Sequence, residues 1–149
     1  MQKTSNGLLL TIEGIDGSGK GTQFRLLAER LAQKGYAVTT LGFPRYTEQS
    51  SYFVREYLRG AYGPAGDVGP YTSSLFYALD RFQAKEHIKA ALERGDIVLI
   101  DRFTGSNMAH QGANFEYPEE RRGFYVWLDN LEYELLKIPR PDLNIVLTV

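Results

Sequence analysis

The sequence contains no cysteine, no long apolar run and no excess of charge of either sign. The lack of cysteine among its 149 residues excludes disulfides and thiolate catalysis and suits a reducing compartment. With 17 basic and 18 acidic residues, no overall field recruits nucleic acid or an anionic membrane. The run Leu8–Leu10 is too short to cross a bilayer, and the opening MQKTSNG lacks the layout of a secretory signal. We therefore expect a soluble, cytoplasmic protein that binds neither nucleic acid nor membrane.

Short apolar runs alternate with helical patterns along the chain. Apolar runs predict four strands, at 8–12, 37–43, 97–100 and 143–149, the last of them buried. Helical spacing predicts helices after the first strand up to Gly35, over 50–59, over 72–94 and after Pro118. The glycine- and proline-rich segment 60–70 predicts a mobile loop rather than an interdomain linker. The alternation indicates an α/β fold with a parallel sheet, in one domain over 1–149.

The longest predicted helix, 72–94, carries two kinds of surface. Its apolar stripe consists of Leu75, Leu79 and Phe82, continued by Ile88, Ala91 and Leu92. Tyr77 and Arg81 lie four residues apart on the opposite side. An aromatic ring and a guanidinium at this spacing suit the stacking and hydrogen bonding of a planar base. The spacing alone is equally typical of a surface cation–π pair.

The segment GIDGSGKGT, 14–22, follows the first predicted strand and opens a helix. It meets the pattern G-x-x-x-x-G-K-[ST] through Lys20, but Gly21 stands where a hydroxyl would meet magnesium. The glycines allow successive N–H groups to point into one hollow, and the helix N-terminus favours an anion there. The alternative is a glycine-rich turn with a solvated lysine. The residues predicted to bind ATP phosphates are Gly14, Gly17, Ser18, Gly19, Lys20, Gly21 and Thr22.

Asp101 directly follows the apolar run 97–100 and is the predicted carboxylate for Mg²⁺. Mg²⁺ dehydrates reluctantly and is often held by one or two carboxylates, substrate phosphates and waters. Gly21 therefore does not exclude the metal. The alternative for Asp101 is an aspartate that caps a turn at the end of a strand.

Several segments together resemble the thymidylate kinases, a family of nucleoside monophosphate kinases with the three-layer P-loop kinase fold. They are GIDGSGKGTQ at 14–23, FPRY at 43–46, YALDR at 77–81, DRFTGSNMAHQGA at 101–113 and IPRPD at 138–142. They occur in the order and spacing of that family and cover essentially the whole chain. The resemblance implies ATP-dependent phosphorylation of dTMP to dTDP with Mg²⁺, by a homodimer.

The resemblance also implies roles for individual residues. Lys20 would contact the donor phosphates, and Asp16 the acceptor's sugar or phosphate region; with Arg102 they form the implied catalytic set. Arg45 and Arg102 would bind the acceptor phosphate. Tyr77 would stack on thymine while Arg81 binds its edge. The further candidates for dTMP binding are Phe43, Ser106, Asn107, His110 and Gln111, with His110 standing where the family usually has Tyr or Phe.

The family carries one more arginine near the donor phosphates, either in the phosphate loop or in a closing lid. The loop position is Gly17 here, and in the family the lid, the fifth strand and a last helix follow the strand at 143–149. We therefore expect a chain incomplete at its C-terminus, without the fifth strand, and of low activity. Two alternatives stay open: a kinase for another nucleoside monophosphate or a deoxynucleoside, and a catalytically weak nucleotide-binding module.

Overall fold

The computed structural model describes residues 7–149, so most of the opening segment MQKTSNG lies outside the described residues. Its contacts divide the chain into two compact units. Of the described residues, unit 1 comprises 7–43, 84–103 and 139–149, and unit 2 comprises 44–83 and 104–138. The long helix α4 (Pro70–Glu93) contributes its first part to unit 2 and its last part to unit 1. Within the described residues, no helix is long and apolar enough to cross a membrane.

Unit 1 is built on four parallel strands. They are β1 (Leu8–Gly14), β2 (Val38–Gly42), β3 (Ile97–Asp101) and β4 (Leu143–Leu147). Their order in the sheet is β2-β3-β1-β4, with Leu9 opposite Val98 and Leu10 opposite Leu143. The predicted α/β fold with four parallel strands is confirmed. This order brings the carboxyl ends of β1 and β3 side by side, where ligands of such sheets usually bind.

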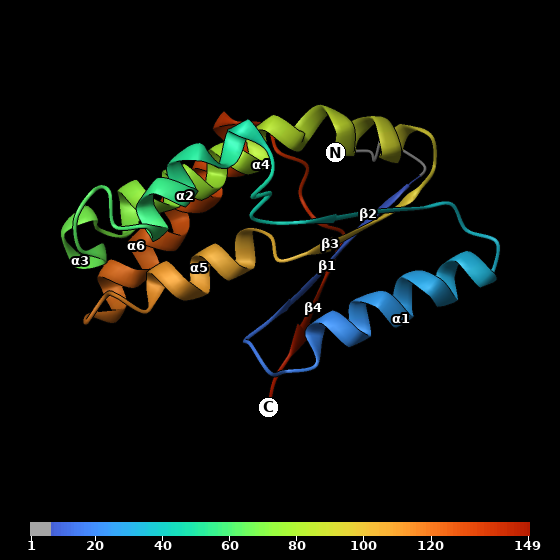
Figure 1. Cartoon of the computed structure of the whole chain (residues 1–149), viewed down its shortest axis with the longest axis horizontal. Helices are drawn as coiled ribbons and strands as arrows, with labels where there is room; N and C mark the ends of the chain where they lie inside the picture. The colour runs from blue at the N-terminus through green and yellow to red at the C-terminus, as the bar shows by residue number, and fades with distance from the viewer. Residues whose placement is uncertain (1–6) are drawn as a thin grey trace. The chain divides into compact units, whose positions relative to one another are not determined.

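Helices cover the sheet of unit 1 on both faces. Helix α1 (Lys20–Gln33) connects β1 to β2, and the end of α4 leads back from β2 towards β3. Because these connections run in opposite directions along the sheet and crossovers are right-handed, the two helices lie on opposite faces, as Figure 1 shows. On α1, the apolar residues Phe24, Leu27 and Leu31 are half-buried, and Ile88 of α4 is fully buried.

The core of the sheet is β3, whereas β4 is not buried. Val98, Leu99 and Ile100 are completely inaccessible to solvent, as expected for a central strand covered on both faces. In contrast, Leu143 is 53% exposed and Val146 63% exposed, so the prediction of a fourth buried strand was wrong. The reason is position: β4 lies at the edge of the sheet and pairs only with β1 among the described strands.

Asp142 of the IPRPD segment attaches β4 to the sheet. Its Oδ2 accepts a hydrogen bond from the Leu9 N–H at 2.8 Å, and its own N–H donates to the Leu9 carbonyl at 2.8 Å. The preceding prolines, Pro139 and Pro141, cannot donate such bonds. One side chain therefore aligns the start of β4 with β1.

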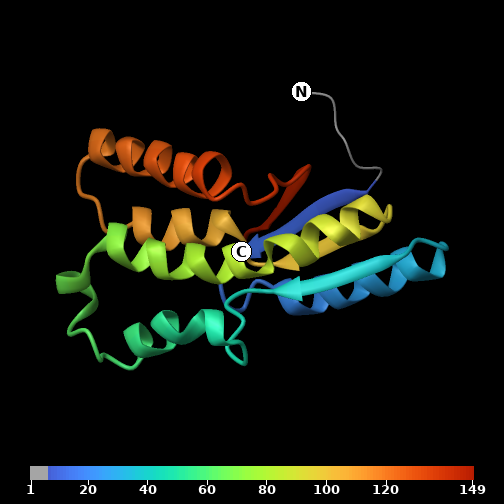
Figure 2. The same ribbon diagram turned by 90° about the horizontal axis from the view of Figure 1, so that it is seen from above.

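Unit 2 is helical. It contains η1 (Gln49–Ser51), α2 (Tyr52–Leu58), α3 (Ala65–Val68), the first part of α4, α5 (Thr104–Gly112), α6 (Pro118–Asp129) and the π-helix η2 (Asn130–Leu135). Helix α5 was not predicted, and 60–70 is not entirely loop because it contains α3 and the first residue of α4. Helices α5 and α6 pack together (Figure 2). Tyr71 of α4 packs edge-on against Phe124 and Trp127 of α6.

The first part of α4 has its buried and exposed sides in a different place from the predicted stripe. Leu79 and Phe82 are each 39% exposed, whereas Ala78, Asp80 and Arg81 are buried. Polar side chains occupy this interior because they have partners there: Asp80 accepts two hydrogen bonds and Arg81 forms an ion pair. An apolar pattern cannot reveal a buried face of this kind.

Candidate functional site

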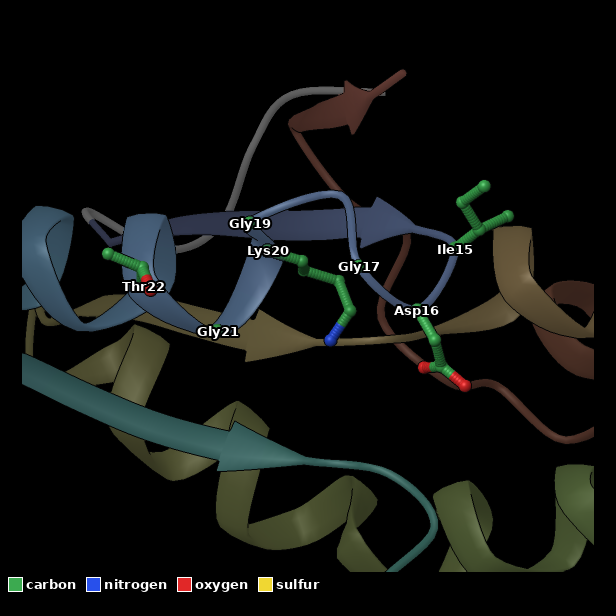
Figure 3. Close-up of a pocket in the computed structure, with 7 residues that line it drawn as sticks. All are labelled: Ile15, Asp16, Gly17, Gly19, Lys20, Gly21 and Thr22. Carbon is green, nitrogen blue, oxygen red and sulfur yellow. The ribbon is translucent and has the colours of Figure 1, made fainter. Parts of the chain in front are cut away.

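The glycine-rich loop surrounds a pocket of about 290 Å³ between β1 and α1 of unit 1. Gly17 and Gly19 have φ angles of 79° and 82°, a region that residues with a Cβ rarely adopt. Gly21 does not, so only two of the three glycines are needed for a positive φ. Figure 3 shows the side chains of Lys20 and Asp16 leaving the loop on the same side, while Ile15 points away from them. The pocket is lined by Ile15, Asp16, Gly17, Gly19, Lys20, Gly21 and Thr22.

Lys20 is the first residue of α1 and forms an ion pair with Asp101 at the end of β3. The Lys20 side chain is 10% exposed and that of Asp101 is 29% exposed. The helix N-terminus and the ammonium group place two sources of positive potential at the same loop. The two predicted residues, one for donor phosphate and one for metal, are therefore in contact.

Arg102 has the left-handed backbone that non-glycine residues rarely adopt, with φ 64°. Its N–H donates to the Ile12 carbonyl at 3.0 Å, and the next N–H, of Phe103, donates to the buried Glu13 carboxylate at 2.8 Å. The Arg102 Nη2 donates a hydrogen bond to Asp16 at 2.6 Å, and this bond joins two of the predicted catalytic residues. Strained backbone of this kind is often found at functional sites. Glu13 was not predicted, although it directly precedes the loop.

Phe43 is buried against Phe103 in unit 1, with ring centroids 5.8 Å apart. Its backbone N–H donates to the Asp101 carbonyl at 3.0 Å. Phe43 therefore supports the ends of β2 and β3.

In unit 2, Asp80 anchors the segment that carries Arg45. Its Oδ2 accepts from the Arg45 N–H at 2.7 Å, and its Oδ1 accepts from the Ser50 hydroxyl at 2.6 Å. The Arg45 side chain is 23% exposed and lies 3.5 Å from Glu48. Sequence reasoning gave Asp80 no role, although it lies within YALDR. It links the FPRY and YALDR segments.

Tyr77 is half-buried on α4 and packs edge-on against Tyr57 of α2, with centroids 6.3 Å apart. Burial raises the pKa of its hydroxyl to about 12, and the neighbouring Tyr57 and Tyr46 add to the effect. The ring is therefore neutral across the physiological pH range. A neutral, oriented aromatic face is what stacking on a base requires.

Arg81 is almost completely buried and forms an ion pair with Glu132 of η2. On α5, Asn107 and Gln111 are buried, whereas His110 is exposed and Ser106 is half-buried. Asn107 donates from Nδ2 to the Ser74 carbonyl at 3.3 Å, and its Oδ1 is buried without a hydrogen-bond partner among the described residues. The residues of unit 2 that were predicted to bind dTMP thus differ in their exposure to solvent. Glu132 was not predicted, because its position four residues after Leu128 gave no sign of a charged partner.

The parallel sheet, with a glycine-rich loop between its first strand and a helix that begins at the lysine, defines the P-loop class of α/β proteins. The sequence model of one branch of this class, the thymidylate kinases, matches residues 12–149. The chain belongs to the thymidylate kinase family.

Individual relatives agree with this assignment. The chain is 38% identical over 127 residues to the thymidylate kinase of Bifidobacterium longum, and 32% identical over 143 residues to that of Mycobacterium tuberculosis. These matches cover 84% and 95% of this chain, but the chain spans only 62% and 66% of those relatives' lengths.

Solved structures of the family have the same fold. The thymidylate kinase of Candida albicans superposes with a TM-score of 0.71 at 25% identity, covering 98% of this chain and 64% of that structure. That of Ehrlichia chaffeensis gives 0.70 at 29% identity, covering 96% and 77%.

Proposed function

We propose that the protein binds ATP and dTMP and transfers the γ-phosphoryl group to dTMP, giving dTDP. The phosphate loop is the observation that carries this proposal. Two glycines in the left-handed region turn the loop around a pocket at the start of α1, with Lys20 among its lining residues. Such transfer needs alignment and charge neutralisation rather than covalent chemistry. In this proposal Lys20 contacts the donor phosphates.

Features within each unit support dTMP as the acceptor. In unit 1, Arg102 supplies a guanidinium group for an acceptor phosphate, and Asp16 holds Arg102 through their hydrogen bond. Tyr77 offers a neutral ring for stacking on thymine. Arg81 can only donate hydrogen bonds, whereas the buried Asn107 Oδ1 can accept one. This donor and acceptor pair suits the carbonyl at C4 and the N3–H of thymine.

Mg²⁺ is the proposed metal, and Asp101 its proposed protein ligand. Among residues 7–149, no group of three or more histidine or acidic side chains could hold a metal alone. One carboxylate beside a phosphate loop nevertheless fits a metal held mainly by phosphates and waters, as Mg²⁺ often is. When bound, Mg²⁺ would neutralise charge on the phosphates.

The role of Gly21 gives a test of this metal site. A Cβ at Gly21 would meet no atom within 4 Å, and its φ is not positive, so serine fits without strain. We expect Gly21→Ser to lower the Mg²⁺ concentration needed for half-maximal ATP binding several-fold, because it supplies the missing hydroxyl. Gly21→Ala, which adds the same carbon without a hydroxyl, is the matched control. Equal Mg²⁺ titrations of the two variants would place the metal away from residue 21.

We also propose that this 149-residue chain turns over slowly by itself and forms a homodimer. The slow turnover is inferred from the loop pocket, whose lining residues include no arginine. A homodimer through α4 would cover the exposed Leu79 and Phe82. Turnover by this chain at the full rate of a thymidylate kinase would contradict the proposal of slow turnover. A monomeric mass, measured by light scattering at micromolar concentration, would contradict the proposal of a homodimer.

The decisive experiment for the reaction is a panel of acceptors incubated with ATP and Mg²⁺, with the products separated by chromatography. We expect dTDP from dTMP to form faster than the products of AMP, dUMP and thymidine. If another acceptor were phosphorylated faster, that acceptor would replace dTMP as the proposed substrate. Saturable binding of ATP without transfer to any acceptor would instead favour a nucleotide-binding module.

A further inference from the structure

Glu132 lies on the buried side of α6 and η2 although it is charged. Phe124, Leu128 and Glu132 occur at intervals of four residues, and each is completely inaccessible to solvent. The π-helical turn has more residues per turn than an α-helix and so rotates the later side chains around the helix axis. As a result Leu135, which apolar spacing predicts to be buried, is 73% exposed. The carboxylate of Glu132 thus enters the interior in line with two core residues.

The partner of Glu132 is Arg81. The Arg81 Nε donates to Glu132 Oε1, and the two side chains are 3% and 0% exposed. The other carboxylate oxygen, Oε2, is buried and has no hydrogen-bond partner among the described residues. Among the described residues, this carboxylate therefore accepts its hydrogen bond from Arg81. Both residues belong to unit 2.

Stability alone is a weak reason for such a pair. Taking two charges out of water costs several kcal/mol, and well-packed apolar residues often replace a buried ion pair without loss. What the pair does provide is orientation, because a guanidinium is planar and carries its donors in a rigid fork. A carboxylate bound at Nε fixes the plane of that fork and hence the direction of its terminal N–H groups.

We propose that Glu132 is a positioning residue for recognition of the acceptor base. By holding Arg81 at Nε, it directs the terminal N–H groups towards a carbonyl of the base. Because arginine has donors only, an oriented guanidinium favours the carbonyl at C4 of thymine and disfavours the amino group at C4 of cytosine. The inference rests on the proposed function, in which Arg81 binds the edge of thymine.

The test compares the affinities of dTMP and dCMP for the full 149-residue chain by calorimetry. In Glu132→Gln we expect the preference for dTMP over dCMP to fall about tenfold, because the neutral amide oxygen accepts a weaker hydrogen bond from Nε and holds the guanidinium less firmly. Glu132→Asp keeps the charge and should retain part of the preference. It also supplies the comparison should Glu132→Gln fail to fold, as judged by circular dichroism.

Phe124→Leu is the matched control, because it disturbs the same buried stripe without touching the ion pair. It should lower Tm and leave the ratio of the two affinities unchanged. If Glu132 had only a structural role, its variants would likewise lower Tm and keep the ratio of the dTMP and dCMP affinities. An unchanged ratio in the Gln and Asp variants would therefore overturn this inference but not the proposed function. No preference for dTMP in the unmodified chain would overturn the proposed function and the inference together.

Discussion

Replacing Lys20 by methionine is expected to lower the affinity for ATP about 10- to 100-fold, the range for losing a charged hydrogen-bond donor. The long apolar side chain keeps much of the packing of Lys20, which is only 10% exposed, but removes its charge. Any phosphoryl transfer should fall about 100-fold or more, because charge on the transferred group is no longer neutralised. Titration with ATP measures the first effect and single-turnover kinetics the second.

Arg25→Met is the control for the Lys20 variant. Arg25 lies on the same helix, and its ion pair with Glu29 is exposed at both ends, with side chains 60% and 51% accessible. Exposed pairs of this kind contribute about 0.3–0.5 kcal/mol, so this variant should bind ATP like the unmodified chain. Equal ATP affinity of the two methionine variants would refute the assignment of Lys20 to the donor phosphates.

Removing the Arg102 side chain is expected to separate stability from binding. Both Arg102→Ala and Arg102→Gly should bind dTMP about 10- to 100-fold more weakly, since each loses a charged contact to the phosphate. Thymidine, which has no phosphate, should bind all three proteins equally. Glycine adopts the observed φ of 64° without strain, so the Gly variant should be about 1 kcal/mol more stable than the Ala variant.

Two measurements check this prediction: calorimetric titration with dTMP and thymidine, and urea unfolding of the Ala and Gly variants. Comparing these two variants cancels the loss of the contact with Asp16, which both lack. Equal losses for dTMP and thymidine would show that Arg102 does not act through the phosphate. Equal stability of the two variants would mean that the backbone of residue 102 relaxes once its side chain is gone.

Apolar patterns and glycine spacing were sufficient to predict much of unit 1. The run at 97–100 predicts β3, and the segment at 14–22 predicts the loop, because strand burial and positive φ are local requirements. The four parallel strands follow from the alternation of strand and helix patterns. The same patterns did not predict the edge position of β4, because the order of strands depends on contacts between distant segments.

Such patterns could not predict which charged and polar side chains are buried. The burial of Asp80, Arg81 and Glu132 could not be predicted from the sequence because it depends on partners far along the chain. The partners of Asp80 lie 30 and 35 residues away, and Arg81 and Glu132 are separated by 51 residues. Helix α5 was also missed, since 104–112 mixes glycine and polar residues without a clear apolar stripe.

The sequence by itself determined the family, the parallel α/β sheet and the glycine-rich loop, since each depends on residue types at short, regular spacings. Only the tertiary structure decided which carboxylates pair with the candidate cations of the site. It pairs Lys20 with Asp101, Arg102 with Asp16 and Arg81 with Glu132. The physical reason is that an ion pair requires two side chains within about 4 Å, and only the folded backbone brings residues so distant in sequence that close.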